Sequence, residues 1–193
     1  MFISEPPPSA ARDAAYQEDL DDDGYVANLT RLWAWRPDVF DAFTALRRQL
    51  HERGQLDDLD LATLVVATAQ ARGDSYCSLA WGARLAELVG EHRAAETLRG
   101  RPESLAARQR ALAEWAASVV SEPNATTPTQ IAELRDCGLG DEAIFEATAF
   151  IAFRLAFSTV NDALGAQPDA QLAQAAPEAV RDAVTFGRPA TVP

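Results

Sequence analysis

One cysteine near the start of a predicted helix carries the strongest chemical signal in this sequence. Cys77 follows Gly73, which ends the preceding helical segment, and stands three residues after Asp74, a good N-cap residue. Unpaired backbone N–H groups and the helix dipole favour a thiolate at such a position. Cys77 is therefore the candidate nucleophile, able to attack a peroxide or another electrophile.

Two neighbours of this cysteine act against that role. The carboxylate of Asp74 lies in the same turn, where a second negative charge is disfavoured, so it raises the pKa of the thiol. Trp81 follows Cys77 by four residues, on the same helical face, and can cover the sulfur as an apolar lid. The alternative is that Asp74 only caps the helix and that Cys77 is a small buried residue packed on Trp81. The residues leave both interpretations open.

Two charged residues interrupt the most apolar segment of the chain. Glu146 and Arg154 are eight positions apart in a stretch that is hydrophobic almost all round from residue 144 to 160. A charge in such a segment needs a partner. Either the two residues form a salt bridge at a subunit interface, or Arg154 binds a carboxylate ligand in a pocket between helices.

The remaining candidates are weaker. Cys137 precedes Gly138 at a predicted helix end, where the dipole disfavours a thiolate, and is interpreted as structural. His51 and His92 have polar neighbours near helix ends and are expected at the surface. No His or Cys pair has metal-ligand spacing, and no glycine-rich loop follows a strand, so we expect neither a metal nor another cofactor.

The elements that must position these residues are predicted to be helices throughout. Alanine is abundant, β-branched runs are short and no hairpin signal is present, which predicts an all-α fold. Proline, glycine and N-cap residues divide the chain into segments. Helices are expected near 9–20, 26–35, 37–53, 58–72, 75–89, 94–98, 104–119, 128–137 and 141–164, with one or two weak ones in the tail.

Size and charge restrict the class of protein. The chain has 193 residues, a net charge of −12 and two cysteines, which fits one domain and no disulfide framework. The acidic balance argues against nucleic acid and anionic membranes as partners. No apolar run approaches the roughly 18 residues of a membrane span, and no secretory signal precedes the first segment. We expect a cytoplasmic protein with reduced thiols.

A family resemblance is carried by the stretches 24–29 with Arg36-Pro37, 72–77, 104–115, 128–139 and 141–144. In their order they resemble the AhpD-like alkylhydroperoxidase and carboxymuconolactone decarboxylase family, in its peroxidase-related branch. The resemblance covers residues 16–165 and implies an AhpD-like helical bundle that forms homo-oligomers, as dimers, trimers or hexamers. The chain would then consist of an arm at 1–15, the helical domain at 16–165 and a helical tail at 166–193.

The family motif is a glutamate, a Cys-x-x-Cys pair twelve residues later and a histidine four residues after the second cysteine. In this sequence those positions hold Ala62, Asp74, Cys77 and Trp81, so only the second cysteine matches. Tyr76 stands between the two cysteine positions and would line the same site. A disulfide needs a second thiol within about 7 Å, and this turn has none. The sequence therefore predicts a protein without the two-cysteine peroxidase cycle.

Three functions remain open after the resemblance. The first is a peroxidase-related protein that keeps the fold and the oligomer without the two-cysteine cycle. The second is a thiol peroxidase or oxidoreductase, of alkylhydroperoxidase or peroxiredoxin type, that uses Cys77 alone. The third is a non-thiol enzyme or binding protein for a small organic acid, as the decarboxylase side of the family implies. The partners would be a second copy of the chain and a small organic or peroxide substrate.

Overall fold

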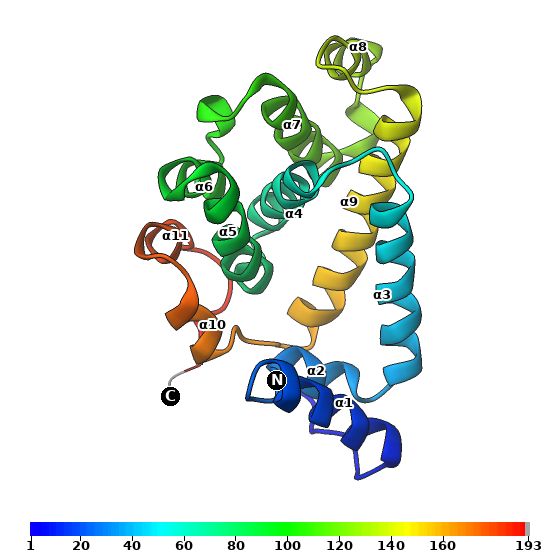
Figure 1. The fold of residues 1–193 in the computed structure, drawn as a ribbon, viewed down its shortest axis with the longest axis vertical. Helices are drawn as coiled ribbons and strands as arrows, with labels where there is room; N and C mark the ends of the chain where they lie inside the picture. Colours follow the sequence, from blue (N-terminus) through cyan, green and yellow to red (C-terminus); the bar gives the residue numbers. More distant parts are fainter. Residues whose placement is uncertain (192–193) are drawn as a thin grey trace.

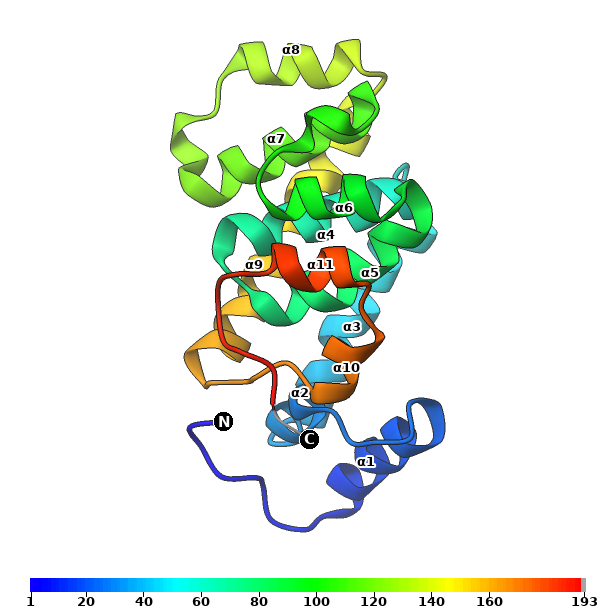
Figure 2. The ribbon, with the colours of Figure 1, turned by 90° about the vertical axis from the view of Figure 1, so that its left-hand side faces the viewer.

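The computed structural model describes residues 1–191, and within them it contains eleven α-helices, two short 3-10 helices and no strand. The predicted all-α fold is confirmed. Figure 1 shows the long helix α9 running beside α3 on one side and beside α4 and α7 on the other. The molecule is elongated, with α8 at one end and α1 at the other (Figure 2).

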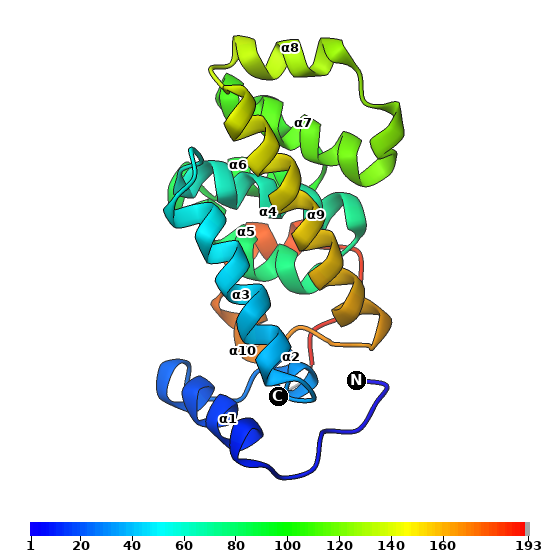
Figure 3. The same ribbon diagram turned by 90° about the vertical axis from the view of Figure 1, so that its right-hand side faces the viewer.

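The first three helices lie at one end of the molecule and along one flank. Pro37 opens α3 at its first position, where a missing N–H costs nothing. The helix α1 crosses residue 15, the expected end of an N-terminal arm. Figure 3 shows α3 running alongside α9. The bounds are Ala10–Asp22 for α1, Asn28–Trp33 for α2 and Pro37–Glu52 for α3.

The pair α4 and α5 forms the centre of the bundle, and both helices begin where the sequence predicts. Asp57 caps α4 (Asp58–Arg72) through a capping box with Asp60. Gly73 ends α4 at φ +78°, a left-handed conformation that favours glycine. Asp74 then caps α5 (Ser75–Val89). Asp74 therefore follows Gly73 directly and starts α5, the helix that carries Cys77.

The middle of the chain departs from the expected bounds. The helix α6 (Glu91–Leu98) starts three residues before the expected position. Residues Pro102–Ser104 form a 3-10 helix rather than the start of α7, which runs over Ala107–Ser121. Leu105, between them, is extended and buried. After a second 3-10 helix at Pro123–Ala125, α8 spans Pro128–Asp136.

The apolar helix α9 (Asp141–Ala163) packs one face against α4 and α7 and leaves the other outside. Ala147 and Ile151 are fully buried, whereas Phe145 is 71 % exposed. By length and composition this helix could cross a membrane, with a mean hydropathy of 1.5 over 18 residues, so the expectation that no run approaches that length was wrong. Half of that window is buried in the bundle, as in the core helix of a soluble protein.

The tail folds back over the central helices. The short helices α10 (Ala170–Ala175) and α11 (Glu178–Ala183) lie against α5, and α11 also contacts α6. Beyond α11, the carbonyl of Arg188 accepts a hydrogen bond of 2.7 Å from Ser75 Oγ. The tail thereby contacts the first turn of the helix that carries Cys77.

The buried apolar residues form two clusters that share one boundary. The larger cluster joins α4, α7 and α9 and includes Cys77, and the smaller joins α4, α5, α6 and α11 around Leu98 and Val180. Trp81 is half-buried and packs against both clusters. This tryptophan therefore lies between the two halves of the core.

Candidate functional site

The candidate nucleophile lies inside the protein, in the first turn of α5. Cys77 is only 3 % exposed, and its backbone N–H donates to Oδ1 of Asp74 at 3.0 Å. The other oxygen of Asp74 accepts a hydrogen bond of 2.5 Å from Ser158 Oγ on α9. Asp74 is therefore both the cap of α5 and a buried link to α9.

A contact that the sequence did not predict joins Cys77 to α9. Arg154 Nη2 lies 2.8 Å from Cys77 Sγ, and the arginine is 3 % exposed. Its guanidinium carbon lies 5.8 Å from the ring centre of Trp81 and 5.2 Å from that of Phe157. Trp81 thus supports the arginine beside the sulfur. The only signal for this contact in the sequence is a charged residue in an apolar helix.

The surroundings hold the thiol of Cys77 in its protonated form. Burial raises its pKa to about 12, because a charged sulfur would lose its hydration. The charge of Arg154 lowers that pKa, and the charge of Asp74 raises it again. Burial thus outweighs the favourable helix start and the adjacent guanidinium, and the thiol is neutral at pH 7.

The other predicted site residues divide between this centre and its surroundings. The hydroxyl of Tyr76, on α5, donates to Asp169, the residue before α10. This side chain therefore holds the tail against α5. Ala62 is fully buried in the smaller core cluster. Glu146 accepts a hydrogen bond of 2.7 Å from the backbone N–H of Gln55. Glu146 and Arg154 therefore bind different partners rather than each other.

A pocket of about 380 Å³ opens beside Trp81, and the sequence reasoning missed its polar residues. His51 Nε2 lies 2.8 Å from Asp58 Oδ1, and Arg84 Nη2 lies 3.6 Å from Asp58 Oδ2. Leu61 and Ala80 complete the lining. His51 and Arg84 come from α3 and α5, far apart in the sequence, so no local pattern could have joined them.

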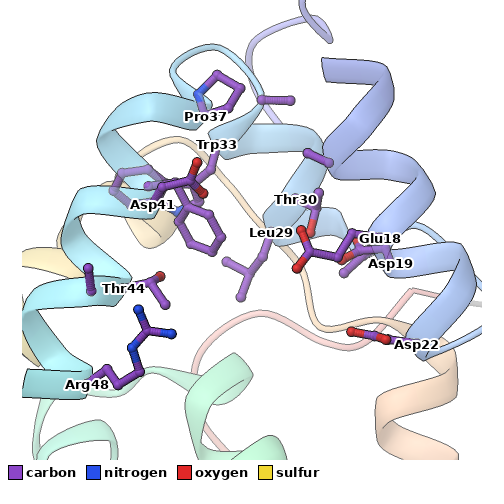
Figure 4. A pocket seen from close by; sticks show the side chains of 15 residues that line it. Glu18, Asp19, Asp22, Leu29, Thr30, Trp33, Pro37, Asp41, Thr44 and Arg48 are labelled. Carbon is purple, nitrogen blue, oxygen red and sulfur yellow. Dashed lines mark hydrogen bonds between the residues drawn. The ribbon is translucent and has the colours of Figure 1, made fainter. Parts of the chain in front are cut away.

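A second pocket, of about 420 Å³, separates α1 from α3. Figure 4 shows Leu29 and Trp33 between the acidic side chains of α1 and the polar ones of α3. Its lining holds four carboxylates and one guanidinium, so its charge disfavours an anionic ligand. The charged residues are Glu18, Asp19, Asp22, Asp41 and Arg48.

Cys137 is half-buried at the C-cap of α8, and both cysteines are free. Within residues 1–191, no group of three or more His, Cys, Asp or Glu side chains is arranged to hold a metal ion.

Comparisons with known proteins give a clear structural result and no match by sequence. No family model matches the chain, and no curated protein matches it. A peroxidase-related protein of Ralstonia eutropha JMP134 with an alkylhydroperoxidase AhpD core is 24 % identical, with a TM-score of 0.69, covering 88 % of this chain and 94 % of its own. A peroxidase-related protein of Silicibacter sp. TM1040 is 23 % identical, with a TM-score of 0.77, covering 89 % and 93 %.

A third solved structure is that of an enzyme. The debrominase Bmp8, in a cysteine-to-alanine variant bound to 2,3,4-tribromopyrrole, is 16 % identical, with a TM-score of 0.71, covering 91 % of this chain and 95 % of its own. Identities this low establish a shared fold rather than a shared activity. The all-helical architecture and these alignments along nearly the whole chain show that the protein has the AhpD-like fold.

Proposed function

We propose that this protein uses the AhpD-like bundle without a two-cysteine peroxidase cycle, and that it binds and acts on a small organic acid in the pocket beside Trp81. The observation that carries the proposal is the polar lining of that pocket by His51, Asp58 and Arg84. Its volume of about 380 Å³ falls within the usual range for small-molecule sites. Asp74 and Trp81 stand where the resemblance implies a cysteine and a histidine.

Each lining residue has a distinct role in the proposal. Asp58 orients the ring of His51, and the second ring nitrogen is then free to exchange a proton with the ligand. Arg84 is held by Glu87, to which its Nη1 donates at 2.8 Å, and its Nη2 lies 3.6 Å from Asp58. The Nη2 group can therefore donate to a ligand carboxylate. The apolar face of Trp81 packs against the carbon skeleton of the ligand.

Calorimetric titration with a panel of aliphatic and aromatic carboxylic acids tests the proposal. We expect at least one acid to bind saturably, and we expect His51→Gln and Arg84→Gln to weaken its binding about tenfold or more, as for loss of a charged hydrogen bond. His92→Gln is the matched control, since His92 is exposed on α6. Equal binding by all three variants, or no binding by the wild type, would reject the pocket as the site.

A second candidate function rests on the contact between Arg154 and Cys77. The adjacent guanidinium lowers the pKa of the thiol, as a single-cysteine peroxidase or oxidoreductase would require. Burial opposes it more strongly. Consumption of an organic hydroperoxide with a small dithiol as reductant separates the two functions. We expect no turnover above that of Cys77→Ser; a rate that depends on Cys77 would favour the thiol enzyme.

A further inference from the structure

Two guanidinium groups, one from the buried Arg154 and one from the half-buried Arg47, lie on the same aromatic ring. The guanidinium carbon of Arg47, on α3, is 5.0 Å from the ring centre of Phe157, and that of Arg154, on α9, is 5.2 Å from it. Arg47 also lies 5.3 Å from the ring centre of Phe43. Contacts of this kind stabilise a cation by less than the burial of an ion destabilises it.

Hydrogen bonding leaves these two cations largely unsatisfied. Arg154 donates to a thiol sulfur, and Arg47 donates only to Thr44 Oγ1, at 3.2 Å. The Nε of Arg47 is buried and has no hydrogen-bond partner. Within residues 1–191 neither arginine has a carboxylate within 4.0 Å. Both therefore keep donors available for an acceptor that the chain does not supply.

In the part of the chain that the structure describes, no acidic side chain neutralises the two guanidinium groups directly. The oxygens of Asp74 accept from Cys77 N–H and Ser158 Oγ. The thiol of Cys77 is neutral, because burial raises its pKa to about 12. Burial and the charge of Arg154 together lower the pKa of Arg47 to about 10. The two arginines thus repel each other beside an uncharged thiol, and a negatively charged ligand would relieve that repulsion.

We propose that Arg47 and Arg154 form a binding site for one small monocarboxylate, held between α3 and α9 beside Cys77. A carboxylate is planar and carries two acceptors, which match the paired N–H donors of a guanidinium. The rings of Trp33, Phe40, Phe43 and Phe157 pack against one another beside the two guanidinium groups, so we choose the smallest carboxylates, formate and acetate, as probes. This site is separate from the pocket of His51 and Arg84 and does not depend on the proposed function.

Thermal unfolding of the whole protein in sodium formate or acetate tests the site, with chloride as the reference at equal ionic strength. A ligand that binds only the folded state raises the melting temperature saturably. We expect such a rise for the wild type, its loss in Arg47→Leu, and its retention in Arg48→Leu. Arg48 is the matched control because it follows Arg47 on α3 but is exposed toward the other pocket.

The variants also distinguish loss of the carboxylate site from a general loss of stability. Removing one of two like charges should leave Arg47→Leu at least as stable as the wild type in chloride, while abolishing the response to formate. Arg84→Gln should keep the full response, which separates this site from the pocket beside Trp81. Equal responses to formate and chloride in the wild type, or an unchanged response in Arg47→Leu, would overturn the proposal.

Discussion

At the scale of single residues, Cys77 is surrounded by groups that change its pKa in opposite directions. Burial and Asp74 raise the pKa, whereas Arg154 and the hydrogen bonding of Ser158 lower it. The side chain thus behaves as a buried neutral thiol. The same residue at the same helix start would favour a thiolate if it were open to water.

The balance at Cys77 can be tested by two substitutions with opposite signs. Asp74→Asn keeps an N-cap acceptor but removes the negative charge, so we expect the pKa of Cys77 to fall. Ser158→Ala removes a hydrogen bond that lowers the pKa, so we expect a rise. Thiolate absorbance in the ultraviolet as a function of pH measures both. Shifts of the same sign would contradict this account of the site.

Asp162, near the end of α9, should destabilise the folded protein at neutral pH. Burial, followed by the charge of Asp74, raises its pKa to about 6 from 3.8, despite Arg72 and Arg188. A raised carboxyl pKa means that stability present below pH 3.8 is lost as pH rises through about 6.

Asp162→Asn should therefore raise the melting temperature above pH 6 and leave it nearly unchanged below pH 4. Because the side chain is half-exposed, the gain is on the order of 1 kcal/mol after solvent screening. Thermal unfolding across pH measures the difference. Equal gains at both pH values would show that the charge of Asp162 is not the cause.

At the scale of elements, the close packing of α5 depends on a residue without a side chain. A Cβ on Gly82 would lie 2.9 Å from Leu98 on α6 and 2.9 Å from Val180 on α11, and both neighbours are fully buried. Glycine is usually the poorer helix residue, yet here it permits the two helices to approach α5.

Gly82→Ala should therefore destabilise the protein by about 1 to 3 kcal/mol, although alanine favours helices. Chemical denaturation measures the change in the free energy of unfolding. In the background of Leu98→Ala, which removes one of the two clashing side chains, the cost of Gly82→Ala should shrink. Purely additive effects would indicate that the neighbouring helices move apart freely.

At the scale of the whole molecule, the outer face of α9 leaves apolar side chains exposed to solvent. Phe145 is 71 % exposed there, and Val39 and Leu46 are exposed on α3. Isolated exposed apolar residues are common, but the resemblance implies an oligomer, so we propose that α9 contributes to a contact between copies of this chain.

Light scattering tests this proposal directly. We expect the wild type to have the mass of a dimer, trimer or hexamer of the 20.8 kDa chain. We expect a smaller mass for Phe145→Glu. Glu142→Gln, in the first turn of the same helix, is the matched control and should leave the mass unchanged. A wild-type protein that is monomeric at high concentration would refute the interface.

Local rules predicted most of the helical segments and the start of the helix that carries Cys77, but not the bounds of α6 and α7. Gly73 and Asp74 act within a few residues, so a left-handed turn and a helix cap can be predicted from local rules. The side chains that surround the sulfur follow from tertiary packing and could not be predicted from local rules. Arg154 is 77 positions away and reaches Cys77 through the packing of α9, and burial then determines the protonation of the thiol. Residue type specified a nucleophile, whereas the packing of distant helices made it a neutral, enclosed thiol.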